Sequence, residues 1–168
     1  MITMKNLILL ALQDFCEAAW TDPDNVKKAL KALGASEDSI TSIKINPEVL
    51  QEGDTPVYVE QRVEKEINDF TISGKYDLVL DGVLNDYKST SVWTYIFDSN
   101  KDSYIKQGSI YKWLSPDKIT SDYININYIF TDWSAAKARA DTKSYPQQKV
   151  LTKKYSLWSP EETQNWIA

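Results

Sequence analysis

The sequence predicts one α+β domain, because its hydrophobic periodicity changes from helical to alternating and back along the chain. Apolar residues recur at helical spacing over 4–19, whereas 57–90 alternates and is rich in Val, Ile, Tyr and Thr. With 168 residues the chain is long enough for one hydrophobic core and short for two. We therefore expect a single domain, 1–168, with a helical N-terminal part (1–54), a core (55–132) and a small C-terminal α/β extension (133–168).

Each expected element has a local signal. Asp22-Pro23-Asp24 begins a helix that Gly34 ends, and 35–54 is expected to complete the helical part. Alternating runs predict strands over 57–67, 69–80 and 82–90, and helical spacing returns over 101–115. The remaining expected elements are a strand within 122–133, a helix at 134–140, a strand near 149–157, and a helix at 160–167 that Ser159-Pro160-Glu161-Glu162 begins as a capping box.

Composition limits the available chemistry. The chain has no His and one Cys, which excludes histidine-based triads, His-ligated metals, disulfide scaffolds and thiolate zinc sites. An enzyme of this composition has to use carboxylates, lysines, hydroxyls and a hard cation such as Mg²⁺.

The net charge of −5 conceals a gradient along the chain. Residues 1–100 hold 9 basic and 17 acidic side chains (a balance of −8), whereas 101–168 holds 10 basic and 7 acidic (a balance of +3). The basic cluster within 135–154 is either a solvated face or a surface that binds DNA phosphates. Its candidates for DNA contacts are Lys137, Arg139, Lys143 and Lys149.

The N-terminal apolar run, Leu7 to Leu12, is only six residues long. That is too short for a membrane span, and no small-residue cleavage site follows it. We expect no membrane association and a cytoplasmic location, with a reduced cysteine.

A predicted hairpin carries the most informative residues. Asp81-Gly82 between alternating hydrophobics is typical of a two-residue loop, and this register places Asp77 directly opposite Asp86. Lys88 then lies on the same face, two residues beyond Asp86.

Two carboxylates directly opposite each other destabilise a hairpin unless something offsets their repulsion. A divalent cation between Asp77 and Asp86 would do so, with Lys88 beside a metal-bound water. The alternative is that the aspartates splay into solvent and Lys88 pairs with one of them.

Three spaced motifs resemble a known family. Gly74-Lys75-Tyr76-Asp77, Asp86-Tyr87-Lys88 and Gln107-Gly108-Ser109-Ile110-Tyr111 are similar, in this order, to the PD-(D/E)XK nucleases of the RecB/Cas4/lambda-exonuclease-like branch. DYKSTSVWTYIF, TDWSAAKARADTKSYPQQ and LWSPEE further resemble phage-encoded members, so the resemblance covers about 56–168.

The resemblance implies a restriction-endonuclease-like core, αβββαβ, whose mixed central sheet is flanked by helices. It implies a Mg²⁺- or Mn²⁺-dependent deoxyribonuclease, of exonuclease type, for phage DNA recombination, repair or degradation in the host cytoplasm. Its partners would be DNA and either further copies of itself or a recombination or helicase protein. By resemblance Asp77, Asp86 and the Tyr87 carbonyl hold the metal, Lys88 orients water, Gln107 and Tyr111 contact DNA or brace the site, and Glu66 is a further acidic candidate.

One departure from the family is the missing N-terminal histidine ligand. Counting four residues from Gly34 reaches Asp38, whose carboxylate is the candidate replacement, with Glu37 beside it. The rival interpretation is a nuclease fold with impaired metal binding that serves as a DNA-binding or protein-interaction module. Of the aromatic residues, Trp93 and Tyr145 are candidates for stacking on bases.

Overall fold

The computed structural model describes residues 22–168, so the expected helix at 4–19 lies outside the described part. The chain divides into two compact units, Met1–Val59 and Glu60–Ala168, and each is considered by itself. The boundary falls inside one long strand, β2 (Thr55–Ile67). No helix in the described part of the chain is long and apolar enough to cross a membrane.

The first unit holds two short helices and a short strand. Helix α2 (Pro23–Ala32) begins where the Asp22 carboxylate accepts the Asp24 N–H at 3.0 Å. Helix α3 (Glu37–Ser42) leads directly into β1 (Ile43–Ile45), which pairs in parallel with the start of β2. The expectation that 35–54 is helical is therefore wrong beyond Ser42, because β1 is stabilised by a partner strand rather than by local sequence.

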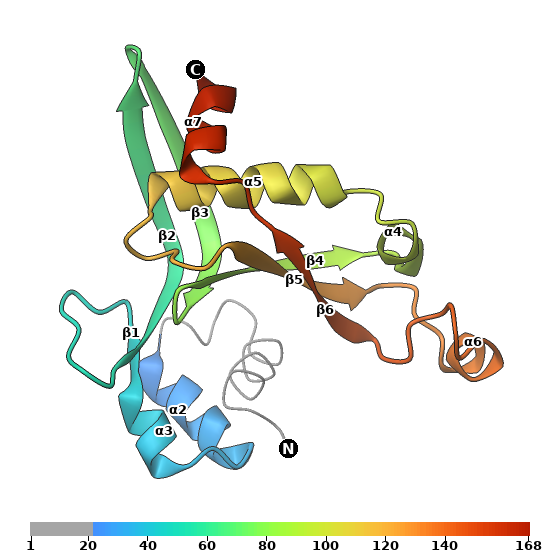
Figure 1. Ribbon diagram of the computed structural model, residues 1–168. Helices are drawn as coiled ribbons and strands as arrows, with labels where there is room; N and C mark the ends of the chain where they lie inside the picture. Colours follow the sequence, from blue (N-terminus) through green and yellow to red (C-terminus); the bar gives the residue numbers. More distant parts are fainter. Residues whose placement is uncertain (1–21) are drawn as a thin grey trace. The chain divides into compact units, whose positions relative to one another are not determined.

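The second unit is built on the rest of the sheet (Figure 1). Strands β1 to β6 follow chain order in one mixed sheet. After β2 come β3 (Phe70–Leu80) and β4 (Val83–Thr90), which are antiparallel, then β5 (Tyr123–Phe130), parallel to β4, and β6 (Val150–Ser156), antiparallel to β5.

The β3–β4 hairpin has the register that its turn residues predict. Asp81 and Gly82 have φ of 48° and 78°, as a two-residue hairpin loop requires. Leu80 lies opposite Val83, and the ladder continues to Leu78 opposite Asn85. Asp77 and Asp86 are the next residues outward on the two strands, so the hairpin brings the two carboxylates to one place.

Helices connect and cover the parallel strands. The crossover from β4 to β5 contains α4 (Val92–Ile96) and α5 (Lys101–Leu114). Helix α5 contacts β3, β5 and β6 and lies across the sheet in Figure 1. The helix expected at 101–115 is thus confirmed, whereas α4 was not expected.

The C-terminal segment is more closely joined to the sheet than an extension would be. Helices α6 (Ala135–Ala140) and α7 (Pro160–Ile167) form where their sequence signals predict, and Ser159 makes the expected capping box with Glu162. Strand β6, however, pairs with β5 along its whole length, from Val150 opposite Ile129 to Ser156 opposite Tyr123. It is therefore the sixth strand of the main sheet.

Candidate active site

Asp77 and Asp86 lie at the point where the β3–β4 ladder opens. The Asp77 carboxylate accepts the backbone N–H of Tyr87 at 3.3 Å, so it is tied to the neighbouring strand. Asp86 is 4 % exposed, whereas Asp77 is exposed to solvent. Burial raises the pKa of the Asp86 carboxyl, Lys88 partly opposes that rise, and the neighbouring Asp77 carboxyl adds to it.

Lys88 stands beside the buried carboxylate. Its Nζ lies 2.6 Å from Oδ2 of Asp86, and 27 % of its side chain is exposed to solvent. Oδ2 of Asp86 is buried and makes no hydrogen bond of normal geometry within residues 22–168, so the ion pair is its main interaction. The Lys88 ammonium also lies 5.4 Å from the Tyr104 ring centroid, on the side of the sheet that faces α5.

A chain of polar contacts joins Lys88 to α5 and back to β3. Lys88 Nζ donates to Gln107 Oε1 at 3.4 Å, and Gln107 Nε2 donates to the Tyr111 hydroxyl at 3.1 Å. That hydroxyl in turn donates to the backbone carbonyl of Lys75 at 2.9 Å. The structure therefore places Gln107 and Tyr111 as braces of Lys88.

Gly74 makes room for this brace. A Cβ atom at Gly74 would lie 2.6 Å from Cε1 of Tyr111, closer than a real Cβ contact allows. The Tyr111 ring also makes an edge contact with Tyr76, with centroids 6.1 Å apart. The glycine and the tyrosine, 37 positions apart, thus meet at one close approach, which explains why a residue without a side chain stands three positions before Asp77.

The other carboxylates proposed from sequence do not gather at this pair. Asn68 and Asp69 both have positive φ at the turn between β2 and β3, and Glu66 is exposed two residues before that turn. Asp77 is eight residues beyond Asp69, about 25 Å along an extended strand. The structure thus places Glu66 near the hairpin tip and does not bring it beside Asp86.

Asp38 is an exposed residue in the first turn of α3, in the first unit. Its role as a metal ligand therefore stays a prediction from sequence. Within the described part of the chain, no three or more acidic or sulfur side chains gather in a metal-binding group.

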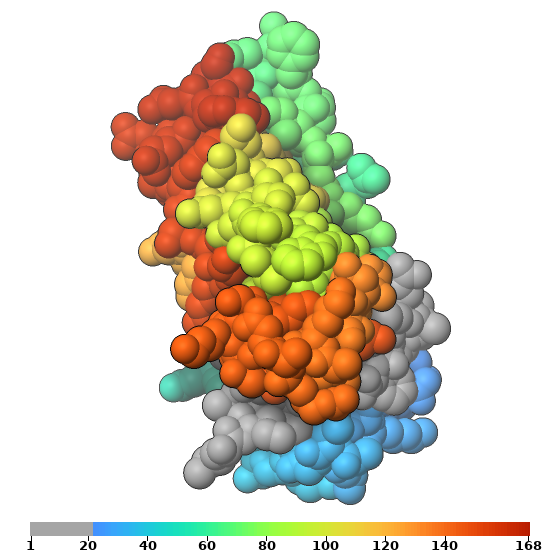
Figure 2. Space-filling model, turned by 90° about the vertical axis from the view of Figure 1, so that its right-hand side faces the viewer, coloured from blue at the N-terminus to red at the C-terminus, as the bar shows by residue number. Residues whose placement is uncertain are grey.

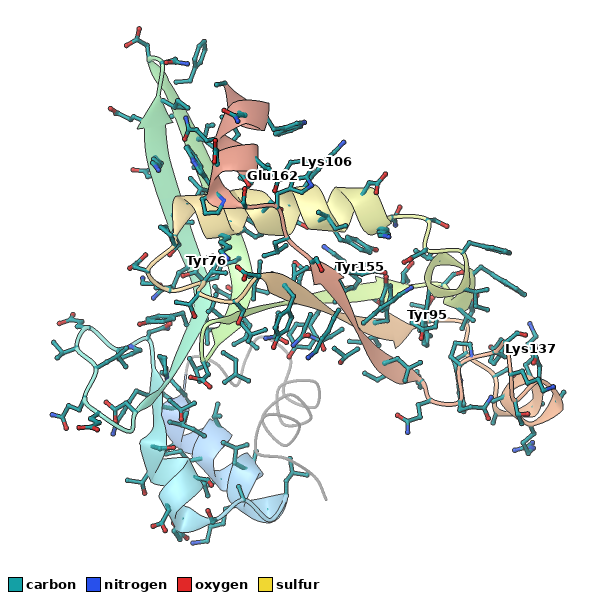
Figure 3. All side chains as sticks on the ribbon, in the orientation of Figure 1. Tyr76, Tyr95, Lys106, Lys137, Tyr155 and Glu162 are labelled. Carbon is teal, nitrogen blue, oxygen red and sulfur yellow. The ribbon has the colours of Figure 1, made fainter. Side chains whose placement is uncertain are left out.

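The four basic candidates lie outside this constellation. Lys137 and Arg139 are exposed on α6, and Lys143 and Lys149 are exposed in the segment that leads to β6. Figure 3 shows Lys137 beyond the strand ends, well away from Tyr76, which precedes Asp77. Figure 2 shows α4 and the segment around α6 as neighbouring parts of one face.

The two aromatic candidates have different environments. Trp93 on α4 is 50 % exposed and stacks on the still more exposed Phe97, with ring centroids 5.8 Å apart. Tyr145 is buried, and its hydroxyl accepts the Ser134 N–H at 3.0 Å. The proposal that Tyr145 stacks on bases is therefore wrong, because the ring packs inside the C-terminal segment.

Sequence reasoning missed a second polar network on the α5 side of the sheet. Asp98 accepts a hydrogen bond from the Tyr155 hydroxyl and pairs with Lys153, whose Nζ is 3.0 Å from Oδ2. The Tyr155 hydroxyl also lies 2.9 Å from that of Tyr128, and burial raises the pKa of Tyr128 to about 12. Asp98 has a positive φ of 55°, a backbone conformation that the sequence does not predict.

The donor set at Asp77 and Asp86 fits a hard divalent cation. Mg²⁺ is commonly held by one or two carboxylates and completes its coordination with waters and substrate phosphates. The pair supplies two carboxylates, one buried and one open to solvent, beside a lysine. The raised pKa of Asp86 indicates a carboxylate whose ionised form lacks sufficient compensation, and a bound cation would provide it.

Comparison with known proteins adds no assignment: no family model, curated protein or solved structure matches this chain.

Proposed function

We propose that this chain is a Mg²⁺- or Mn²⁺-dependent deoxyribonuclease with a restriction-endonuclease-like core. The observation that carries the proposal is the meeting of Asp77, Asp86 and Lys88 at one opening of the sheet. The order of β3, β4, α5 and β5, with β4 and β5 parallel, is consistent with that core. The resemblance to phage-encoded nucleases supports a role in DNA recombination, repair or degradation.

Each residue of the site would have a role that follows from its burial and charge. Asp77, Asp86 and the Tyr87 carbonyl would hold the cation, which would supply positive charge at the scissile phosphate and lower the pKa of a bound water. Lys88 would orient the attacking water by donating a hydrogen bond from Nζ to its oxygen, since its ammonium stands beside the buried Asp86 carboxylate. Gln107 would fix the direction of Lys88, and Tyr111 would fix Gln107.

Cleavage of DNA tests this proposal. The chain is incubated with linear duplex, circular duplex and single-stranded DNA in Mg²⁺ or Mn²⁺, and we expect cleavage that EDTA abolishes. Asp86→Asn and Lys88→Ala should each lower the rate by at least about 10²-fold, the scale of a lost acid–base group. Lys75→Ala is the matched control, since it removes an exposed lysine of the adjacent strand that pairs with Glu60. Activity that survives both active-site substitutions would overturn the assignment, and cleavage of linear but not circular DNA would identify an exonuclease.

A second candidate function rests on the small number of side chains that could bind a metal. Only two carboxylates meet in the described residues, and the chain has no His. A nuclease fold with weakened metal affinity would act as a DNA-binding or protein-interaction module. It would bind DNA in EDTA with strong salt dependence and show no turnover in either metal.

A further inference from the structure

The first unit carries a basic hollow that no part of the proposed nuclease chemistry uses. It has a volume of about 350 Å³ and lies between α2, α3 and β1. Its lining residues are Lys27, Lys28, Lys31, Glu37, Ile40, Thr41 and Lys44. Four ammonium groups and one carboxylate give it a formal charge of +3, although residues 1–100 as a whole are acidic.

Two of the four lysines are already engaged. Lys31 pairs with Glu37, which raises the Lys31 pKa through a hydrogen bond and charge attraction. Lys44 Nζ donates to the Thr41 carbonyl at 3.2 Å and lies 3.8 Å from Asp54. These contacts hold one lysine on each side of the hollow and leave it with a net positive charge.

The other two lysines are available to a ligand. Lys27 and Lys28 are exposed on α2 and form no ion pair with any residue that the structure describes. Lys27 and Lys31 are one helical turn apart, so their side chains lie on the same face of α2. Among residues 22–59, the hollow therefore presents two ammonium groups without an acidic partner next to two positioned ones.

The lining also indicates the chemical class of the ligand. It contains no aromatic ring on which a nucleobase could stack, and its one aliphatic side chain, Ile40, is only 6 % exposed. Much of the lining is the aliphatic part of these side chains, but four of its five charged groups are ammonium groups, which recognise anionic oxygens. We propose that this hollow binds the phosphates of a DNA backbone, as a contact separate from Asp77 and Asp86. The choice of DNA among phosphate ligands rests on the proposed function.

Binding without metal tests this inference independently of cleavage. Fluorescence anisotropy of a labelled 20-base-pair duplex is measured in EDTA over a series of salt concentrations. Each phosphate contact contributes about 0.9 to the slope of log K against log salt on duplex DNA. We therefore expect Lys27→Ala/Lys28→Ala to weaken binding and to reduce that slope by about 2.

Two further variants distinguish DNA binding through the hollow from a general effect of the chain's net charge. Lys65→Ala/Lys106→Ala removes the same number of charges from exposed positions in the second unit that the proposed active site does not use, and should change the slope by much less. Glu37→Gln removes the only carboxylate of the hollow and should tighten binding. Equal losses in the two double-alanine variants, or weaker binding by Glu37→Gln, would overturn the proposal.

The test also distinguishes other phosphate sources. Pyrophosphate at millimolar concentration is titrated against the wild-type chain and the Lys27→Ala/Lys28→Ala variant by calorimetry. Pyrophosphate binding that depends on these lysines, with no DNA binding, would assign the hollow to a small phosphate ligand and overturn the DNA assignment. A chain that binds DNA through the hollow yet cleaves none would refute the nuclease proposal and leave this contact standing.

Discussion

The Lys88 ammonium lies 2.6 Å from the Asp86 carboxylate, two positions away on the same face of β4. Asp86 is almost fully buried, and this partner does not compensate its desolvation, because the pKa of the carboxyl remains raised. A buried carboxylate of this kind lowers stability when it is ionised, and the proposed cation would offset that cost.

Replacing Asp86 should stabilise the free protein at neutral pH. Because the folded pKa of Asp86 is raised, the native state retains a proton that the unfolded state loses near pH 4, so stability falls as pH rises through that window. Asp86→Asn removes this penalty. We expect a higher thermal midpoint than wild type at pH 7, and a smaller difference at the acid end of the window, followed by circular dichroism in EDTA. Asp77→Asn, at an exposed position, is the control and should raise the thermal midpoint by less than Asp86→Asn does. A midpoint of Asp86→Asn below that of wild type at pH 7 would contradict the account.

The close approach of Gly74 to Tyr111 predicts a steric cost. Gly74→Ala places a methyl group 2.6 Å from the Tyr111 ring and should reduce the free energy of unfolding by about 1–3 kcal/mol, the usual range for overpacking. Denaturant unfolding measures it, and Ser73→Ala, an exposed neighbour in β3, is the control with a change near zero.

A double variant shows whether the ring is the cause. In Gly74→Ala/Tyr111→Ala the added methyl meets no ring, so the cost of the glycine substitution should largely disappear in that background. Simple additivity of the two single changes would mean that the backbone at Gly74, rather than the contact with Tyr111, sets the cost.

Much of the fold follows from local signals, and the exceptions have physical reasons. Asp81-Gly82 fixed the hairpin register, and Ser159-Pro160 marked the start of α7, because turn and cap chemistry acts over a few residues. Strand β1 has only three residues and exists because each of them pairs with a residue of β2 twelve positions further along the chain. Helix α4 is made of Val-Trp-Thr-Tyr-Ile, residues that favour strands, so its helical state reflects its tertiary setting.

The site was predictable to a similar extent. Spacing along one hairpin predicted the neighbourhood of Asp77, Asp86 and Lys88. Gly74 lies on a strand and Tyr111 on a helix, so their close approach depends on how the two elements pack. The periodicity of the sequence within each element does not predict it. Glu66 was proposed from its place one strand earlier, but the length of the β2–β3 hairpin carries it toward the tip.

The Asp98 network predicts an acid-sensitive contribution to stability. Burial alone would raise the Asp98 pKa, but the hydrogen bond from Tyr155 and the pairing with Lys153 lower it overall. A lowered folded pKa stabilises the protein above about pH 4 and loses that effect as pH falls through the folded value. Tyr155→Phe should cost about 1.5–3 kcal/mol at pH 7, the range for a hydrogen bond to a charged group, and less at pH 3. Urea unfolding at both pH values measures this, and an equal loss at both would show that packing, not Asp98, accounts for the effect.

Calorimetric titration with Mn²⁺ tests the central claim most directly. If Asp77 and Asp86 hold a divalent cation beside Lys88, the wild-type chain should take up Mn²⁺ with release of protons from Asp86 near its raised pKa, whereas Asp77→Asn and Asp86→Asn should each bind at least about tenfold more weakly. Glu66→Gln serves as the control and should bind as wild type does, since its side chain lies near the hairpin tip. Mn²⁺ uptake that is unchanged in both aspartate variants would contradict the account.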